Sequence, residues 1–379
     1  MRIIVNGIPL LSPRSGVGNY VYQNFKALLS LRSEWDVSFY YGVQWSASLR
    51  DRPAEPYVSA RKFIRRLRKG YPAYRATLDF LFGVGQWWRK DDLYHETNYV
   101  PMKYNGPTVL TVFDLSFHLF PETHPPERIR YMERYFYPRL ERVTRFITIS
   151  EAIKQEMIEH LGLPKDKITV TPLGVDENFK PIFPDQLRPA IKKYGLKRGS
   201  YILYIGTLEP RKNIINLLKA YSILPFSLRE QYPLVLAGGT GWLMEGLDRE
   251  IEQLHIQKTV IKTGYVPKED LPSLYSGAVI FVYPSLYEGF GLPPLEAMAC
   301  GTPVITSSVS SLPEVVGDAG VLVHPEDVEK LAEEMQDLLT NPPRRQILSA
   351  MGLERSKHFT WGKCASKTLE VYDRVVRNK

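Results

Sequence analysis

Cysteine is scarce in this chain of 379 residues, which contains only Cys300 and Cys364. Two cysteines so far apart do not form a disulfide framework, and they fit a reducing compartment. No spacing among the seven histidines is typical of metal ligands, so we predict no metal site. The chain also lacks an apolar run near the roughly 18–20 residues needed to cross a bilayer, and its first residues do not read as a secretory signal.

The composition is that of an ordinary globular protein, with 44% apolar and 24% charged residues. The length favours two domains over one core. A net charge of +8 favours anionic partners, such as nucleotide phosphates, anionic lipid or nucleic acid. Nucleic acid is the weakest of these candidates, because no recognisable binding module accompanies the charge.

Positive charge is concentrated in one segment, where aliphatic and aromatic residues lie between the cations. The cations are Arg61, Lys62, Arg65, Arg66, Arg68 and Lys69, and a second aromatic-basic cluster follows at Phe80, Leu81, Phe82, Trp87, Trp88, Arg89 and Lys90. Such a segment can lie on an anionic membrane surface. A solvated helix face beside ordinary core aromatics is the alternative, and both interpretations stay open here.

Strand and helix patterns alternate along the first half of the chain. We predict strands at residues 2–6, 36–41, 93–95, 108–113, 145–148 and 168–171, and helices at 18–31, 126–140 and 150–161. Alternation of this kind predicts an α/β fold, with a parallel sheet covered by helices.

The second half repeats this plan with a first strand of its own. We predict strands at residues 201–205, 234–237, 260–263, 279–283, 303–306 and 320–323, and helices at 213–224, 327–339 and 364–376. Between the halves, residues 174–189 are rich in proline and charge and are predicted to be a linker.

The most informative stretch runs from Tyr287 to Glu296, where two glutamates stand eight positions apart. Glu288 follows a predicted strand, and the Pro293–Pro294 pair can open a helix whose first turn holds Glu296. The free amides at such a helix start suit phosphate, and carboxylates can accept hydrogen bonds from sugar hydroxyls. Each glutamate alone could be a surface charge or a favourable acid at a helix start. Together, these features favour a nucleotide-sugar site.

This run, followed by Ala297-Met298-Ala299-Cys300-Gly301-Thr302-Pro303-Val304, resembles the signature of retaining glycosyltransferase family 4. The resemblance implies the GT-B architecture, with two Rossmann-like domains facing each other across a cleft. We therefore expect an acceptor-binding domain at 1–177, a nucleotide-sugar-binding domain at 190–355, and a terminal helix at 356–379 that returns to the first domain.

A second motif, Gly206 to Asn213, ends the first strand of the second half. Arg211 and Lys212 stand just before a helix, where cations are unfavourable unless they share an anion. The motif resembles the diphosphate-binding motif of the family, in which such cations offset charge on the leaving diphosphate. Because they would reduce the need for a metal ion, we expect no metal and no separate cofactor.

The resemblance also assigns roles to individual residues. Glu288 would contact the donor sugar and, with Arg211, Lys212 and Asp114, form the catalytic set, while Glu296 would hold the ribose. Further donor contacts are implied for Gly16, Gly18, Gly206, Tyr265, Val266, Phe290, Gly291 and Leu292. Plain tight turns are the competing interpretation for the glycine-rich segment near Gly16 and for the turn at Tyr265.

The first half departs from the family at Phe113, where many relatives carry a histidine that touches the donor sugar. Asp114 could take part of that role, or His118 could reach in from the next loop, although an isolated histidine is more often structural. Ser150 and Glu151 match a Ser-Glu pair at a cleft-facing helix start. His95 and Asn98 follow another strand and could meet the acceptor.

The resulting expectation is a retaining hexosyltransferase at the inner face of the cell membrane. It would move mannose or rhamnose from a GDP-sugar to a lipid-linked or polysaccharide acceptor in bacterial surface glycan synthesis. A UDP-sugar donor is the first alternative. A sugar-nucleotide epimerase and a non-catalytic sugar-nucleotide binding subunit are the alternatives from other classes.

Overall fold

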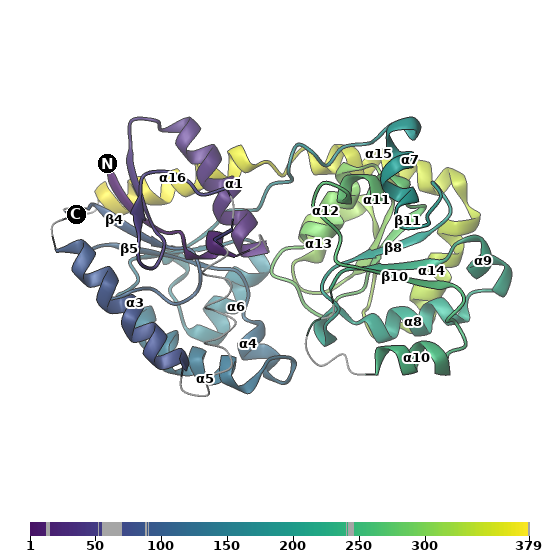
Figure 1. Cartoon of the computed structure of the whole chain (residues 1–379), viewed down its shortest axis with the longest axis horizontal. Coiled ribbons are helices and arrows are strands. Elements are labelled where there is room, and N and C mark those ends of the chain that lie inside the picture. The colour runs from purple at the N-terminus through teal and green to yellow at the C-terminus, as the bar shows by residue number, and fades with distance from the viewer. Residues whose placement is uncertain are drawn as a thin grey trace. The chain divides into compact units, whose positions relative to one another are not determined.

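The computed structural model describes residues 1–12, 16–51, 53–54, 70–87, 89, 91–239, 241 and 246–377. The chain forms two compact units. The first consists of residues 1–121, 125–174 and 361–379, and the second of residues 122–124 and 175–360. Each unit is a sheet covered by helices (Figure 1). Within the described residues, no helix is both long and apolar enough to cross a membrane.

The first unit has a seven-stranded sheet in the order β3-β2-β1-β4-β5-β6-β7. Its strands are β1 (Arg2–Asn6), β2 (Asp36–Tyr40), β3 (Trp45–Ser46), β4 (Leu93–Glu96), β5 (Thr108–Val112), β6 (Arg145–Thr148) and β7 (Ile168–Val170). All pairs are parallel except β2 with β3. The chain leaves β1 toward β2 on one side and later returns to β4 on the other, so the strand order reverses between β1 and β4.

The helices of the first unit include α1 (Gly16–Leu31), α3 (Gly70–Gln86), α4 (Ser116–Leu119), α5 (Pro126–Tyr135), α6 (Glu151–Leu161) and α16 (Trp361–Arg377). Short 3-10 turns complete them at η1 (Ile8–Leu11), η3 (Tyr137–Arg142) and η4 (Lys165–Lys167), and η2 (Pro121–Thr123) has residues in both units. The C-terminal helix α16 packs against α1, and it buries Cys364, Leu369 and Tyr372. The last helix of the chain is therefore part of the first unit.

The second unit has a six-stranded parallel sheet in the order β10-β9-β8-β11-β12-β13. Its strands are β8 (Ile202–Ile205), β9 (Leu234–Ala237), β10 (Val260–Gly264), β11 (Ile280–Tyr283), β12 (Val304–Ser307) and β13 (Val321–Val323). Strands β8, β9, β11 and β12 are buried along their whole length. This fits a parallel sheet that is covered on both faces.

The helices of the second unit are α7 (Pro184–Lys192), α8 (Ile214–Ile223), α9 (Phe226–Gln231), α10 (Leu247–Gln253), α11 (Leu271–Gly277), α12 (Leu292–Ala299), α13 (Leu312–Val316), α14 (Val328–Thr340) and α15 (Pro342–Ser356), with turns η5 (Pro210–Lys212) and η6 (Gly317–Ala319). The doubly wound α/β fold predicted from the sequence is confirmed in both units.

Two helical predictions needed correction. The predicted linker, residues 174–189, overlaps α7 from residue 184 onward, because Pro184 suits a first helical turn and Leu187 and Ile191 bury the inner face of the helix. The helix predicted at 126–140 ends at Tyr135 and continues as the turn η3. Proline lacks an N–H and disfavours helical backbone in the residue before it, so Pro138 explains this interruption.

Helix α3 escaped sequence prediction because its charged residues point inward. Arg75 is buried and the Asp79 side chain is 9% exposed, and the two side chains pair at 3.1 Å between Nη2 and Oδ1. Phe80 and Val84 instead are 69% and 48% exposed. An apolar stripe usually marks the buried face of a helix. Because Leu78 and Phe82 are buried while Phe80 and Val84 are exposed, apolar residues lie on both sides of α3 and the helical periodicity is concealed.

Candidate functional site

The carboxyl ends of β8 and β11 lie side by side in the second sheet, at the point where the strand order reverses. In open α/β sheets this reversal point is where ligands bind, because the loops that leave its two strands diverge. The two loops here are residues 206–213 after β8 and residues 284–291 after β11. The sequence-predicted residues Arg211, Lys212 and Glu288 all lie on them.

Glu288 is the centre of a buried polar cluster, and its side chain accepts hydrogen bonds from both loops. Its Oε1 lies 2.5 Å from Lys212 Nζ, 2.6 Å from Ser285 Oγ and 3.0 Å from the hydroxyl of Tyr283. Lys212 Nζ also donates to Tyr283 at 2.7 Å. Glu288 and Lys212 are only 8% and 9% exposed, so this ion pair is largely removed from solvent.

Arg211 joins the cluster from the other side and links the same two loops. Its Nη1 donates to the backbone oxygen of Tyr287 at 2.5 Å and lies 3.5 Å from Glu288 Oε2. Its Nη2 donates to Glu209 Oε1 at 2.8 Å. Two acids and two cations therefore form a compact, mutually neutralising group, which we call the acid–cation quartet: Glu209, Arg211, Lys212 and Glu288.

The quartet keeps Glu288 ionised. Burial alone would raise the pKa of this carboxyl, but the positive charges of Lys212 and Arg211 and the donated hydrogen bonds outweigh burial and lower the pKa to about 2. Glu288 is thus a carboxylate at any physiological pH. The site holds fixed negative and positive groups within a few ångströms of each other.

Asn213 fixes the end of the cation-bearing loop. Its backbone is left-handed, with φ of 59°, a conformation that asparagine tolerates better than most residues. Its side-chain amide donates to the backbone oxygens of Pro284 at 3.0 Å and Pro325 at 2.6 Å. The first bond ties the β8 loop to the β11 loop, and the second ties it to the segment after β13, so the two halves of the quartet are held in register.

The helix predicted after the Glu288 loop is present as α12. Gly291 caps it with φ of 114°, and a Cβ atom there would lie 2.7 Å from Leu312 Cδ2. Both facts require glycine. Leu292 and the two prolines form the first turn, and the backbone oxygens of Glu288 and Phe290 accept hydrogen bonds from Ser311 Oγ, each at 2.8 Å. The β11 loop is thereby fixed to the start of α13.

Glu296 occupies a different environment on α12. Its Oε2 accepts a hydrogen bond from the Tyr275 hydroxyl at 3.0 Å. Burial raises the pKa of Glu296 to about 7, against the lowering effect of that hydrogen bond. The two predicted carboxylates therefore have opposite electrostatics: Glu288 is permanently ionised, and Glu296 titrates near neutrality.

Comparison with known proteins decides the family. Residues 14–179 match the family model described as Glycosyltransferase Family 4, and residues 188–355 match the one described as Glycosyl transferases group 1. The O-antigen chain mannosyltransferase B of Escherichia coli is 38% identical over 98% of this chain and 99% of its own length. The chain belongs to the family 4 glycosyltransferases.

Solved structures agree with this assignment at the level of fold. The sucrose-phosphate synthase of Thermosynechococcus elongatus superposes with a TM-score of 0.77 at 22% identity, covering all of both chains. WaaG, a glycosyltransferase involved in lipopolysaccharide biosynthesis, superposes with a TM-score of 0.73 at 18% identity, covering 98% of this chain and 99% of its own. The predicted GT-B fold and glycosyltransferase activity are confirmed.

The remaining donor-side residues of this glycosyltransferase lie at the same edge of the second sheet. Gly206 directly follows β8, and Gly238 directly follows β9. A Cβ atom on Gly238 would lie 1.9 Å from the backbone oxygen of Gly206, so the backbone passes too closely here for any residue but glycine at position 238. Tyr265 is 75% exposed just after β10, whereas Val266 is buried. Their contact with a nucleobase stays a prediction.

In the first unit, Asp114 follows β5 as predicted. Its Oδ1 accepts from the backbone N and the hydroxyl of Ser116, at 3.1 and 2.8 Å, and it also hydrogen-bonds the buried Tyr99. Phe113 is buried, with its ring edge-on to Tyr20 at 5.1 Å between centroids. Gly16, exposed, and Gly18, buried, lie in the first turn of α1.

The acceptor-side predictions fall on residues with very different surroundings. His95 is completely buried, with Nδ1 2.5 Å from the Tyr372 hydroxyl and Nε2 2.8 Å from Thr111 Oγ1, and burial lowers its pKa to about 3. It is a neutral core residue that ties α16 to the sheet, so its position favours a structural role. Asn98, in contrast, is exposed.

His118 and the Ser150–Glu151 pair complete that set. His118 is exposed on α4, with Nδ1 2.8 Å from the Tyr137 hydroxyl. Ser150 Oγ accepts from the backbone N of Ile153 at 3.3 Å, which is the N-cap of α6, and Glu151 is exposed in the first turn. Within the described residues, no group of three or more His, Cys, Asp or Glu side chains is placed to hold a metal ion.

Sequence reasoning missed several members of the site. Glu209, Tyr283 and Ser285 all contact the quartet or belong to it. A signal was present, because each lies within five residues of Arg211 or Glu288 at the end of a buried strand. Their sequence positions alone do not show which side chains turn toward the carboxylate.

Proposed function

We propose that this glycosyltransferase transfers mannose, or alternatively rhamnose, from a GDP-sugar to a lipid-linked or polysaccharide acceptor in the synthesis of a bacterial surface glycan. The relative that supports the sugar and the pathway is named an O-antigen chain mannosyltransferase, and it matches nearly the full length of this chain. The observation that carries the chemistry is the buried acid–cation quartet at the strand reversal of the second sheet.

In this proposal the donor diphosphate takes over the charges of Arg211 and Lys212, both of which already point at an anionic group, Glu288. Arginine offers a planar fork for phosphate oxygens and lysine a point charge. Preorganised cations of this kind stabilise the charge that develops on a leaving diphosphate. The amides at the start of α12 would add donors for the sugar and phosphates.

The reaction retains the anomeric configuration. The bond between the anomeric carbon and the diphosphate oxygen breaks, and the acceptor oxygen bonds to the same face of that carbon. The acceptor proton moves to the departing phosphate oxygen, so no protein base is required. Glu288 accepts hydrogen bonds from sugar hydroxyls and stabilises the oxocarbenium-like transition state, Glu296 holds the ribose, and Asp114 contributes from the first unit.

The test is a donor screen with the full chain. GDP-mannose, GDP-rhamnose and a panel of UDP-sugars are incubated with lipid-linked acceptor, and release of nucleoside diphosphate is measured alongside the anomeric configuration of the product by NMR. We expect turnover with a GDP-hexose and an axially linked product that matches the donor. Turnover confined to UDP-sugars would overturn the donor assignment, and an inverted product would overturn the mechanism.

We further propose that the enzyme works as a peripheral protein on an anionic membrane surface, at the cytoplasmic face. Phe80 and Val84 of α3, and Trp87 just after it, are 69%, 48% and 82% exposed and lie four and three residues apart, on one side of the helix. The six predicted cations of residues 61–69 precede α3 but lie outside the described residues, as do Trp88 and Lys90. An apolar stripe next to basic residues suits an interfacial position.

Vesicle flotation tests the membrane proposal. The full chain is mixed with vesicles containing phosphatidylglycerol, and we expect it to float with them, with binding reduced in the double variant Phe80→Ser, Trp87→Ser. If the chain stays in the soluble fraction at low salt, the membrane proposal is wrong, and the proposed transfer reaction is not affected.

A further inference from the structure

A small cavity lies beside α3 in the first unit. It has a volume of about 200 Å³ and is lined by Pro101, Met102, Lys103, Tyr104, Thr108, Pro138, Arg139 and Arg142. Thr108 begins β5, and Arg142 ends η3 just before β6. The cavity therefore opens near the amino ends of these strands, opposite the edge at which parallel sheets bind their substrates.

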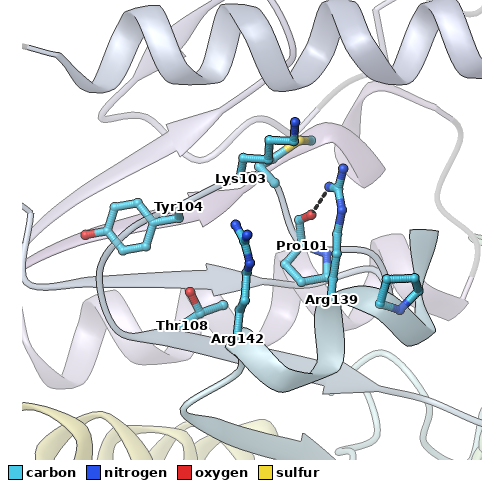
Figure 2. Close-up of a pocket in the computed structure, with 8 residues that line it drawn as sticks. Pro101, Lys103, Tyr104, Thr108, Arg139 and Arg142 are labelled. Atoms are coloured by element: carbon cyan, nitrogen blue, oxygen red, sulfur yellow. Dashed lines mark hydrogen bonds between the residues drawn. The ribbon is translucent and has the colours of Figure 1, made fainter. Parts of the chain in front are cut away.

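The charged residues of this cavity are all cationic. Lys103, Arg139 and Arg142 are the only ionisable side chains among its lining residues apart from the hydroxyl of Tyr104. Figure 2 shows the three side chains rising toward the same side of the pocket, Arg139 and Arg142 from η3 and Lys103 from the loop before β5. Like charges repel when they converge, so such a grouping favours an anion that all three can share.

One of the three cations is already fixed in place. Arg139 Nη2 lies 2.6 Å from Asp79 Oδ2, and its Nη1 lies 3.2 Å from Asp79 Oδ1, while the same guanidinium donates to the backbone oxygen of Pro101 (Figure 2). Asp79 is therefore neutralised, and Arg139 contributes a rigid donor. Arg142 and Lys103 make no ion pair with an acidic side chain in the described part of the chain, so they leave two uncompensated charges at the cavity.

The walls of the cavity connect it to α3. Met102 and Tyr104 pack with Leu78 and Phe82 from the inner side of that helix. The Tyr104 hydroxyl donates to the backbone oxygen of Asp91 at 3.1 Å, four residues beyond Trp87. The cationic pocket and the helix with the exposed apolar stripe are thus parts of one packed structure.

We propose that this pocket binds the phosphate of an anionic phospholipid headgroup. The inference rests on the membrane clause of the proposed function and deepens it, because it replaces a diffuse attraction to negative charge with one built site. Arg142 and Arg139 would hold phosphate oxygens through their guanidinium groups, and Lys103 would add a point charge. The carbon surfaces of Pro101, Met102 and Pro138 would contact the glycerol portion of the lipid.

The test compares two double variants of the full chain that lose the same charge. Lys103→Gln, Arg142→Gln empties the pocket of its uncompensated cations, and Lys165→Gln, Lys167→Gln removes two exposed cations from η4 of the same unit. Affinity for phosphatidylglycerol vesicles is measured by flotation at fixed salt. We expect the pocket variant to lose roughly ten- to thirty-fold in affinity, and the control to change less than about threefold. Equal losses of vesicle affinity in the two variants would overturn the proposed pocket site and would show that general surface charge causes the binding.

Two further arms separate the lipid from other sources of phosphate and from failure of the enzyme proposal. Inorganic phosphate and glycerol phosphate at millimolar concentration should not displace the chain from vesicles; displacement would make a soluble phosphate the ligand and overturn the lipid assignment. Release of nucleoside diphosphate with a water-soluble acceptor should be equal in the wild type and the pocket variant, which shows that the fold is intact. An inactive wild type that still binds vesicles through the pocket would sink the donor proposal and leave this inference standing.

Discussion

The two sheets place a glutamate at the same topological point and use it in opposite ways. In each unit the strand order reverses between the first and fourth strands, β1 and β4 in one and β8 and β11 in the other. Glu96 ends β4, and Glu288 lies in the loop after β11. Comparing these two residues shows what turns a structural position into a chemical one.

Glu96 is a clamp. It is completely buried, and its carboxyl accepts hydrogen bonds from Asn6 Nδ2, the Tyr94 hydroxyl and the backbone N of Asn98, at 2.5, 2.5 and 2.8 Å. Burial raises its pKa, even though these bonds and the charge of Arg75 act in the other direction. Its partners belong to β1, β4 and the following loop, so this carboxyl holds the strand ends together.

Glu288 differs in the charge of its partners. Lys212 and Arg211 overcome the effect of burial and hold its pKa at about 2. A buried carboxylate paired with cations is a poor source of stability, because desolvation offsets most of the attraction. The paired charges do, however, produce a strong local electric field at the edge of the sheet, where ligands bind. The comparison indicates that the cations, more than the glutamate, distinguish the second reversal point from the first.

Glu288→Gln is the most direct test of this difference between Glu288 and Glu96, because it removes the charge of the side chain and keeps its shape and most of its hydrogen bonds. We expect the rate of transfer to fall by roughly 10²–10³-fold, the usual effect of losing one well-placed electrostatic contact in a transition state. Release of nucleoside diphosphate measures the effect. Glu288→Ala is the poorer variant, because a buried cation left without its partner can cost about 3–5 kcal/mol of stability.

The matched control is Glu96→Gln, the same change at the other reversal point. It should leave the transfer rate per folded molecule within about threefold of the wild type, since loss of a clamp acts on stability and not on the transition state. A loss of activity as large as that of Glu288→Gln would show that the two points are functionally alike.

Glu96→Ala should affect folding more than activity. The change leaves Asn6, Tyr94 and the Asn98 backbone N without their acceptor, and each of the two buried side chains, Asn6 and Tyr94, costs about 1–3 kcal/mol when left unpaired. We expect a marked fall in the unfolding midpoint in urea at an unchanged Michaelis constant for the donor. A variant as stable as the wild type would show that water replaces the carboxyl and that the clamp contributes little.

The sequence predicted the regular parts of the fold well, because parallel strands buried on both faces leave clear apolar runs. Strands β1, β6 and β9 have the predicted bounds. Helix α3 was not predicted, since it buries Arg75 together with Leu78 and Phe82 and leaves Phe80 and Val84 exposed, so its apolar residues mark no single face. Helix α7 was hidden by the prolines that made its segment read as a linker.

The site was predictable only as far as one-dimensional patterns allow. Glu288, Arg211 and Lys212 were expected at neighbouring strand ends, and the structure brings them into direct contact. The sequence could not show that Glu209 would share Arg211, or that His95 would be enclosed by Tyr372 from a helix 277 positions away. Such contacts depend on side-chain direction and on packing between distant segments.

Glu209 offers a subtler perturbation of the quartet, because it acts on Arg211 and not on the carboxylate itself. Glu209→Gln keeps a hydrogen bond to Arg211 Nη2 but removes its charge, and charged hydrogen bonds exceed neutral ones by about 1 kcal/mol. We expect the Michaelis constant for the donor to change by roughly fivefold, with a smaller change in kcat. This split identifies a positioning residue, and a change confined to kcat would contradict that role.

The last expected effect concerns the pH dependence of donor binding and separates Glu296 from Glu288. The folded-state pKa of Glu296 is raised from 4.5 to about 7, so the folded protein binds this proton more tightly than the unfolded chain does. The contribution of that proton to stability is complete below pH 4.5 and is lost as the pH rises through 7. In the proposed site the ionised Glu296 accepts hydrogen bonds from the ribose, and the protonated form must first lose its proton. Because the protonated form predominates at pH 6 and the ionised form at pH 8, the Michaelis constant for the donor should be about three- to tenfold higher at pH 6 than at pH 8. Glu288 stays ionised over this range and adds nothing to the profile. Glu296→Gln should flatten the profile, and an unchanged profile in that variant would assign the titration to another group.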